Sequence, residues 1–295
     1  MKKIFTLTFF LFTALIIGLS SFKPAPSKSF EKFLKKSAYT FIPSGKAFVN
    51  NREETVQSFY ISKGEVTNFQ YQEFLSYLRT HNETEKLKIC QIDSSNWTTA
   101  KSSNKGMEDF YHTHIAYRDY PVVNISHEAA ELYCEFIRKA LGEAFPGTDM
   151  LVRLPTFTEY VRAARGDSPD MRYAWNSNET RNKDGQILGN FVRIGEECVT
   201  RNTETGKFEV TLDGIPPYVA NGSKDVLAPS QSYWPNSMGV YNLSGNAAEM
   251  INEKGVAVGG SWNNPGYDVR IDSRKEYTGT DKTVGFRVVF TYSGK

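Results

Sequence analysis

The second half of the chain is dominated by residues that form turns, and this feature limits the folds available to the protein. Beyond Gly166, Asn, Gly and Ser recur in clusters, which favour turns and loops over helices. We therefore expect few helices there. Two short apolar runs, Val256 to Val258 and Gly285 to Thr291, have the pattern of strands. The turn-rich clusters are WNSNETRNKDGQ, TRNTETGKFEV, ANGSKD and PNSMGVYNLSGN.

The first half carries the helical patterns. Apolar residues at helical spacing predict a helix in VTNFQYQEFLSYLRTH, with Thr67 or Asn68 as its N-terminal cap. A second helix is predicted from about Ser126 to Leu141, with Ser126 as its cap. A third is predicted from Leu154 to Gly166, where the glycine would end it.

The order of these patterns favours one α+β domain over residues 38–293. FIPSGKAFVNN and VQSFYISKGEV alternate apolar and polar residues around a polar turn, which is typical of a hairpin. Residues 22–37 are rich in Pro, Ser and Lys and read as a linker, so structure is expected to begin near Tyr39.

Residues 1–21 have the pattern of a secretory signal peptide. A short positive start precedes a charge-free apolar run from Ile4 to Leu19, and small residues follow at Ser20 and Ser21, where cleavage is expected. The run is near the lower limit of about 17 residues for a membrane span, so an uncleaved signal that anchors the protein is the alternative. The mature protein is expected to be exported.

Composition excludes two classes of protein. With 35 Lys and Arg against 33 Asp and Glu, the formal net charge is +2 and no long basic stripe is present, so nucleic acid is not expected as a partner. A hydrophobic content of 40% is enough for a large core and argues against disorder.

The three cysteines, Cys90, Cys134 and Cys198, are too few for a disulfide framework. Cys134 is expected in a helix core, and the pairing of Cys90 with Cys198 stays open.

Six strings occur in an order that resembles one protein family. They resemble the formylglycine-generating enzyme family, also called the sulfatase-modifying factor family, over about residues 38–291. The resemblance implies a compact fold related to the C-type lectin type, with modest regular secondary structure, structural calcium, and export in bacteria. The strings are EVTNFQYQEF, YPVVNISHEAAELYCEF, RLPTFTEYVRAARG, GVYNLSGNAAEM, GGSW and GFRVVF.

Enzymes of this family oxidise a cysteine of a target peptide to formylglycine, and hold copper with two cysteines just after a GGS[YW] segment. Here the corresponding stretch, from Gly259 to Phe290, contains no cysteine. Asn264 and Val269 stand near those positions, and neither an amide nor a methyl group replaces a thiolate, the soft ligand that selects Cu(I). We therefore expect no enzyme activity and no copper. The alternative, that Cys198 moves into the site, is disfavoured by the two glutamates beside it.

A calcium site is implied by the resemblance at four residues. Asn242, Gly245, Ala247 and Glu249 match the family's calcium-binding segment position by position. A hard cation takes six to eight oxygens, which amide, carbonyl and carboxylate groups of a tight glycine-containing loop supply. Taken without the resemblance, the same spacing favours a glycine turn leading into a strand, with Glu249 in solvent.

A second calcium position is implied at Asn190 and the Phe191 carbonyl, with Asp225 as the acidic partner. The chain departs from the family here by an apparent insertion from Gly195 to Tyr218, which leaves the register of the acidic partner uncertain.

His112 and His114 stand two residues apart and would share one face of a strand, an arrangement that can begin a transition-metal site. Two ligands do not complete such a site, and no further histidine is close in sequence. We prefer a pair of exposed or hydrogen-bonded histidines.

A residual ligand-binding groove is expected where the family binds its substrate. Trp262, Asn264, Asp272 and Arg274 would line it, and this mixture of aromatic, amide and charged groups suits an extended peptide or a glycan. The alternative is that Arg274 and Arg287 form buried ion pairs and that Trp262 belongs to the core.

These observations predict a non-catalytic, exported scaffold or partner-binding protein of a Gram-negative cell envelope, in the periplasm, at the outer membrane or on the cell surface. The resemblance extends to cysteine-free gliding-motility and type IX secretion proteins of Bacteroidota, whose family domains serve as scaffolds. Those proteins are usually lipoproteins, whereas this chain has no cysteine in its first segment. Alternatives are a divergent metal-dependent oxidase that uses the histidine pair, or a lectin-like binder of surface glycan or peptidoglycan.

Overall fold

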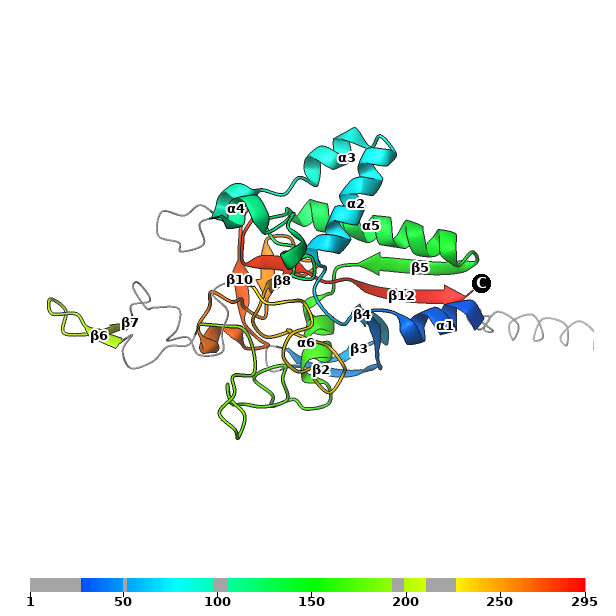
Figure 1. Ribbon diagram of the computed structural model, residues 1–295. Coiled ribbons are helices and arrows are strands. Elements are labelled where there is room, and N and C mark those ends of the chain that lie inside the picture. Colours follow the sequence, from blue (N-terminus) through cyan, green and yellow to red (C-terminus); the bar gives the residue numbers. More distant parts are fainter. Residues whose placement is uncertain (1–27, 50–51, 98–105, 193–198, 211–226, 295) are drawn as a thin grey trace, which may run out of the picture.

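The computed structural model describes residues 28–49, 52–97, 106–192, 199–210 and 227–294. Figure 1 shows helices concentrated in the first half of the chain and loops with short strands in the second half. The described residues after Gly166 contain no α-helix, as the turn-rich sequence predicts. The α-helices are α1 (Lys28–Lys36), α2 (Asn68–Thr80), α3 (Thr84–Ile89), α4 (Met107–Phe110), α5 (His127–Ala144) and α6 (Phe157–Arg165), and the 3₁₀ turns are η1 (Ser94–Trp97), η2 (Ile115–Tyr117) and η5 (Gly266–Val269).

Two four-stranded sheets form the centre of the fold. The first has the order β1-β4-β12-β5 and is antiparallel throughout. The second has the order β10-β9-β8-β11, in which only the pairing of β8 with β11 is parallel. Their strands are β1 (Tyr39–Ile42), β4 (Phe59–Ser62), β12 (Val289–Gly294), β5 (Thr148–Arg153), β10 (Arg274–Glu276), β9 (Val256–Val258), β8 (Ala248–Met250) and β11 (Val284–Phe286). Two hairpins are separate: β2 (Gly45–Val49) with β3 (Arg52–Val56), and β6 (Val199–Arg201) with β7 (Phe208–Val210).

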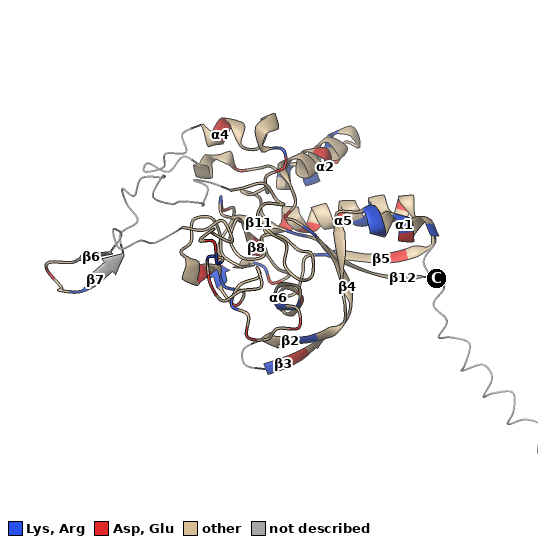
Figure 2. Ribbon diagram, turned by 60° about the horizontal axis from the view of Figure 1, so that its bottom comes forward, with Lys and Arg blue, Asp and Glu red and all other residues tan. Residues whose placement is uncertain are grey.

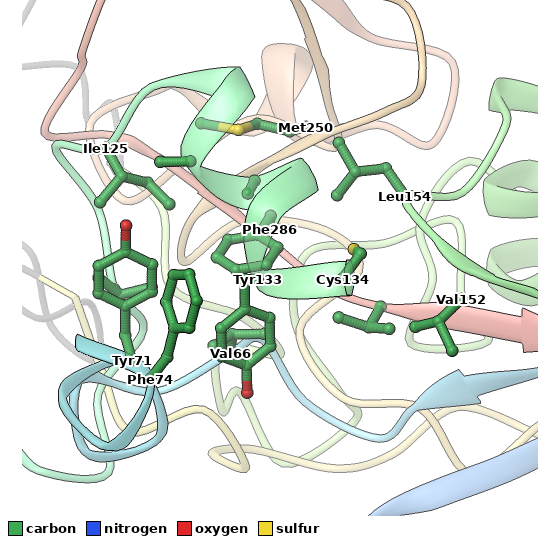
Figure 3. Packing of buried hydrophobic residues seen from close by; sticks show 14 of the residues in the cluster. Val66, Tyr71, Phe74, Ile125, Tyr133, Cys134, Val152, Leu154, Met250 and Phe286 are labelled. Carbon is green, nitrogen blue, oxygen red and sulfur yellow. The ribbon is translucent and has the colours of Figure 1, made fainter. Parts of the chain in front are cut away.

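The first sheet separates two apolar clusters, because successive side chains of a strand point to opposite faces. Phe290 joins the cluster that contains residues of α2 and α5, whereas its neighbour Val289 joins the cluster that contains residues of α6 and the β2–β3 hairpin. Figure 3 shows the first cluster, where Tyr71 and Phe74 of α2 face Tyr133 of α5. The ring of Tyr133 packs edge to face with those of Phe74 and Phe286, a favoured arrangement, and it stacks on that of Tyr71.

Helix α1 corrects the expectation that residues 22–37 are a linker and that structure begins near Tyr39. Its residue Phe30 is completely buried and packs against the rings of Phe145 and Tyr292. A segment with few apolar residues can still dock if one of them is a large aromatic, since burying such a side chain contributes about 1.5–3 kcal/mol. Composition alone did not predict this helix, because Tyr292, on which Phe30 packs, lies at the other end of the chain.

The three predicted helices are confirmed, together with their caps. Thr67 begins α2 and Thr156 begins α6, and each forms a capping box with the Gln or Glu three residues later. The Ser126 hydroxyl accepts from the Ala129 backbone N–H at the start of α5. Gly166 ends α6 with a positive φ of 60°. The hairpin expectation was partly right: β2 and β3 form a hairpin, while β1 pairs with β4 outside it.

The predicted strand from Gly285 to Thr291 is two strands that belong to different sheets. β11 ends at Phe286 and β12 begins at Val289. Between them Arg287 is fully buried, with its guanidinium bound inside the protein. The need to place this charge beside a buried partner breaks the alternation that predicted one continuous strand.

Charged residues of both signs are distributed along the described chain (Figure 2). Within the described residues, none of the helices combines the length and the apolar composition required to cross a bilayer.

Candidate functional site

A buried ion pair lies at the centre of the fold. Arg287 and Glu249 are 0% and 1% exposed at their side chains, and both carboxylate oxygens accept from the guanidinium, Oε2 from Nε at 2.5 Å. Arg287 also donates to the carbonyls of Ser62 and Tyr241, at 3.0 and 2.9 Å. Burial raises the pKa of Glu249, and the adjacent guanidinium opposes that shift. This is the buried arginine pair that the sequence analysis held as an alternative.

Two asparagines bind a second glutamate, Glu65, which interacts electrostatically with both members of this pair. Asn246 is completely buried and satisfied on both atoms of its amide: Oδ1 accepts from the Ala228 N–H at 2.7 Å, and Nδ2 donates to Glu65 Oε1 at 2.8 Å. Asn242 Nδ2 lies 3.3 Å from the other oxygen of Glu65. Both asparagines have left-handed backbones, with φ of 66° and 54°, a conformation that Asn tolerates better than most residues.

Glu65 is a second buried carboxyl group whose pKa is raised. It is 2% exposed, and burial together with the nearby Glu249 raises its pKa to about 7, against the opposing effect of Arg287. Glu65 also contributes to the wall of a cavity of about 430 Å³, whose walls include Phe69, Asp119 and Ser230. The Glu65 backbone carbonyl accepts from the Ser230 hydroxyl at 2.7 Å.

The implied calcium ligands do not form a free set of oxygens. Glu249 is bound at both carboxylate oxygens by Arg287, whose charge would repel a cation placed there. Among the described residues, no group of three or more His, Cys, Asp or Glu side chains is placed to hold a metal ion. The residues therefore do not fit a calcium ion held by Glu249. Glu249 fits the role of counter-ion, and calcium binding at Asn242, Gly245 and Ala247 stays a prediction.

The second calcium set is only partly described. Asn190 is 1% exposed, its carbonyl accepts from Asn246 N–H at 2.8 Å, and its Nδ2 donates to Asn246 Oδ1 at 3.1 Å. Gly245, at φ 83°, passes so close that a Cβ there would lie 2.5 Å from the Asn190 carbonyl oxygen. Phe191 packs in an aromatic cluster with Trp175. Asp225 lies outside the described residues. The two implied sets are thus neighbours in space.

The positions that stand near the family's copper cysteines hold groups already engaged in the fold. Asn264 Oδ1 accepts from the backbone N–H and the hydroxyl of Ser261, at 3.0 and 2.6 Å. Val269 is completely buried at the end of η5. Between them, Tyr267 is 69% exposed and the Arg270 guanidinium stacks 3.8 Å from the centre of its ring. These groups shape a turn and leave no thiolate for a soft metal.

The expected groove does not assemble as one site. Trp262 is 8% exposed and stacks on Trp97 with ring centres 6.4 Å apart, so it belongs to the core, as the alternative proposed. Arg274 lies elsewhere, over the ring of Phe157, and pairs with Glu253 at 2.5 Å. That pair is exposed, unlike the buried one that the alternative described. Asp272 lines a different hollow, beside α6.

The two histidines point to different partners. They lie in a turn after α4 and at the start of η2, not in a strand, which corrects the expected geometry. Trp97 Nε1 donates to His112 Nε2 at 3.3 Å, so the proton of the neutral ring sits on Nδ1, which faces Asn68 Oδ1 at 3.1 Å. Burial lowers the pKa of His112 to about 3. His114 Nδ1 accepts from the Ala116 N–H. The preferred interpretation, a pair of hydrogen-bonded histidines, is confirmed.

The two described cysteines are free and buried. Burial raises the pKa of Cys90 to about 11 and that of Cys134 to about 12, which keeps both as inert thiols. Cys134 lies in the core of α5, as predicted. Cys198 lies outside the described residues, and Cys90, its possible partner, is a free thiol in this structure.

Sequence reasoning missed Glu65 as part of this centre. Its only signal was its position in the string EVTN, directly before a predicted helix. Nothing in that position connects Glu65 with residues 242–249. Arg287 gave a stronger signal, because a charged residue inside the apolar run GFRVVF must be paired if it is buried.

Comparison with solved structures shows the fold. The structure titled "Crystal Structure of CarF" matches with a TM-score of 0.53 and 20% identity, over 85% of this chain and 97% of that one. The structure of PvdO from Pseudomonas aeruginosa matches with a TM-score of 0.52 and 17% identity, over 87% of this chain and 94% of that one. At these identities the likeness carries no functional conclusion.

Curated relatives at low identity are formylglycine-generating enzymes. The protein from Bos taurus is 25% identical over 221 residues, which are 68% of this chain and 50% of the relative. The protein from Thermomonospora curvata is 29% identical over 162 residues, or 55% of this chain and 42% of the relative. The chain thus spans about half the length of these relatives or less. A family model described as "Sulfatase-modifying factor enzyme 1-like domain" matches residues 27–292, and the chain therefore belongs to this family.

Proposed function

We propose that this family member is non-catalytic and acts by binding partner proteins in a bacterial cell envelope. The observation that carries the proposal is the absence of cysteine from residues 259–290, where the family's copper ligands would stand. In their place are the amide of Asn264, bound to Ser261, and the buried methyl groups of Val269. Neither supplies the soft sulfur ligand that Cu(I) requires.

The state of the remaining thiols supports the same proposal. Oxidation of a substrate cysteine by the family's chemistry needs reactive, accessible sulfur, and both described cysteines are buried with raised pKa values. The histidine pair that would support a metal-dependent oxidase is split between two separate hydrogen-bond partners. The described part of the chain therefore offers a folded body with surfaces for binding and no assembled redox centre.

Export and the finer role rest on the sequence. The apolar run from Ile4 to Leu19 is the feature that supports export, to the periplasm or the outer cell surface. In its most specific form, the proposal is that the partners belong to a gliding-motility or type IX secretion complex, which rests on the resemblance to the scaffold proteins of those systems.

Chemical crosslinking in native envelopes tests the proposal, followed by purification of the protein and identification of what is bound. We expect specific envelope proteins above the background of an unrelated exported protein. Recovery of none, together with binding on a glycan array, would contradict partner binding and favour a lectin-like role. Stoichiometric copper or iron in the purified protein would favour the oxidase instead.

A further inference from the structure

Strand β2 has an unpaired edge. Among the residues that the structure describes, the hairpin sheet consists of β2 and β3, so one edge of β2 has no neighbouring strand there. Arg165 Nη1 donates to the Phe48 carbonyl at 2.6 Å from outside the hairpin, which shows that this carbonyl points away from β3. Antiparallel pairing alternates with a period of two residues, so the N–H and C=O of Lys46 point the same way. This edge therefore presents backbone groups that could pair with another chain.

Two adjoining hollows run along this edge. The first, of about 490 Å³, lies between residues 45–48 and residues 165–169. The second, of about 550 Å³, continues past Phe48 and Val49 to Phe157, Asp170 and Asp272. Phe48, Arg165 and Pro169 line both hollows, so the two form one groove, which we call the β2 groove. Figure 1 shows β2 and α6 side by side at this margin of the molecule.

The charges of the β2 groove favour a basic occupant in its second hollow. Asp170 and Asp272 are both exposed there, and Asp272 also lies 3.7 Å from Arg270 Nε in an ion pair. The one basic residue, Arg165, is already bound to the carbonyls of Phe48 and Met171. The ring of Phe157 is already covered by the Arg274 guanidinium, so Asp170 is the main group in this hollow for a basic side chain of a partner.

We propose that the β2 groove binds an extended peptide segment of a partner protein, which pairs with β2 and places a Lys or Arg side chain beside Asp170 and Asp272. This inference rests on the proposed partner-binding function and names the surface that performs it. The Phe48 carbonyl is already bound by Arg165, so main-chain hydrogen bonds to the N–H and C=O of Lys46 and to the Phe48 N–H would supply affinity. The acidic hollow would supply specificity. A strand of five residues, the length of β2, spans about 17 Å and matches a peptide of the same length.

The competing explanation is that this edge is protected against pairing. Natural proteins place lysine on short edge strands for that purpose, and Lys46 forms an exposed ion pair with Glu53 at 2.5 Å. The two explanations differ in whether a peptide with the right charge binds.

The test is a titration of the ¹⁵N-labelled protein, followed by NMR, with the synthetic peptide acetyl-Thr-Val-Lys-Val-Thr-amide. We expect chemical-shift changes confined to β2 and residues 165–170, and at least fivefold weaker binding when the peptide's Lys is replaced by Glu. Lys46→Pro removes an N–H that points into the groove without touching the bonds to β3, and should weaken binding at least tenfold. Lys46→Ala is the matched control and should bind as the parent does, while Asp170→Asn with Asp272→Asn should abolish the preference for Lys.

Absence of shifts at millimolar peptide, or binding that Lys46→Pro leaves unchanged, would overturn the inference in favour of a protected edge. Equal melting temperatures of the Pro and Ala variants confirm that the fold is intact. The crosslinking experiment, repeated with Lys46→Pro, separates the two levels of the argument. Partners that are retained by this variant would refute the β2 groove and leave the proposed function standing, whereas no partner in either protein would refute the proposed function.

Discussion

Replacing Glu249 with Gln should destabilise the protein strongly, because it removes the carboxylate that is hydrogen-bonded to the buried Arg287 guanidinium. Both side chains are at most 1% exposed, and arginine does not lose its proton in proteins. Breaking such a pair typically costs about 3–5 kcal/mol of unfolding free energy. For a domain of this size, a loss of 1 kcal/mol lowers the melting temperature by about 2–4 °C, so we expect a decrease of roughly 6–20 °C.

Arg287→Met should behave differently, because a carboxyl group can become neutral where a guanidinium cannot. Burial already raises the pKa of Glu249, and removing Arg287 removes the effect that opposes this shift. A raised pKa stabilises the fold below that pKa, and the benefit is lost as pH increases through it. Arg287→Met should therefore lower the free energy of unfolding more at pH 8 than at pH 5, whereas the loss caused by Glu249→Gln should be similar at the two pH values.

Urea unfolding of both single variants and the double variant measures the coupling. The double variant should lose less stability than the sum of the two, by about 0.5–3 kcal/mol, because its second substitution removes the orphaned group. Glu253→Gln, which removes the exposed pair with Arg274, is the control and should cost less than about 1 kcal/mol. Additive single effects, or a pH-independent Arg287→Met, would refute the reasoning.

Three further results are expected. Phe30→Ala should lower the free energy of unfolding by about 3–5 kcal/mol, because it opens a cavity under α1, whereas Lys32→Ala on the exposed side of the helix should be near neutral. Equal stability of the two variants would favour the interpretation of this segment as a linker. The pKa of His112 is about 3 in the folded protein, so below about pH 6 only the unfolded chain binds a proton at this residue. The free energy of unfolding should therefore decrease by about 1.4 kcal/mol for each pH unit below that point, and the urea midpoints of His112→Gln should depend less on acid. Calcium should raise the melting temperature and a chelator should lower it, and an unchanged melt on chelation would reject the Asn242 prediction.

Local signals were sufficient for the helices of the first half. The caps at Thr67, Ser126 and Thr156 are short-range hydrogen bonds, so residue type and spacing predict them without knowledge of the fold. The turn-rich second half was recognisable for the same reason, since Asn and Gly tolerate the left-handed backbone of Asn242 and Gly245.

Long-range contacts explain what the sequence did not reveal. Phe30 packs on Tyr292, and Glu65 is bound by Asn246, contacts that join distant parts of the chain. The resemblance correctly indicated the family, but it transferred a calcium role to Glu249 that ignores Arg287, its partner in the structure. A role carried over by position alone omits the partners that decide what a buried carboxylate does.

Incubation of the purified protein, loaded with Cu(I), with a cysteine-containing sulfatase peptide under oxygen tests the central claim most directly. Mass spectrometry would detect the conversion of the thiol to an aldehyde, with an established formylglycine-generating enzyme as the positive control. The account predicts unmodified peptide, and the same result for Cys198→Ser. Aldehyde that forms in proportion to the amount of this protein, and that is lost in Cys198→Ser, would contradict the account.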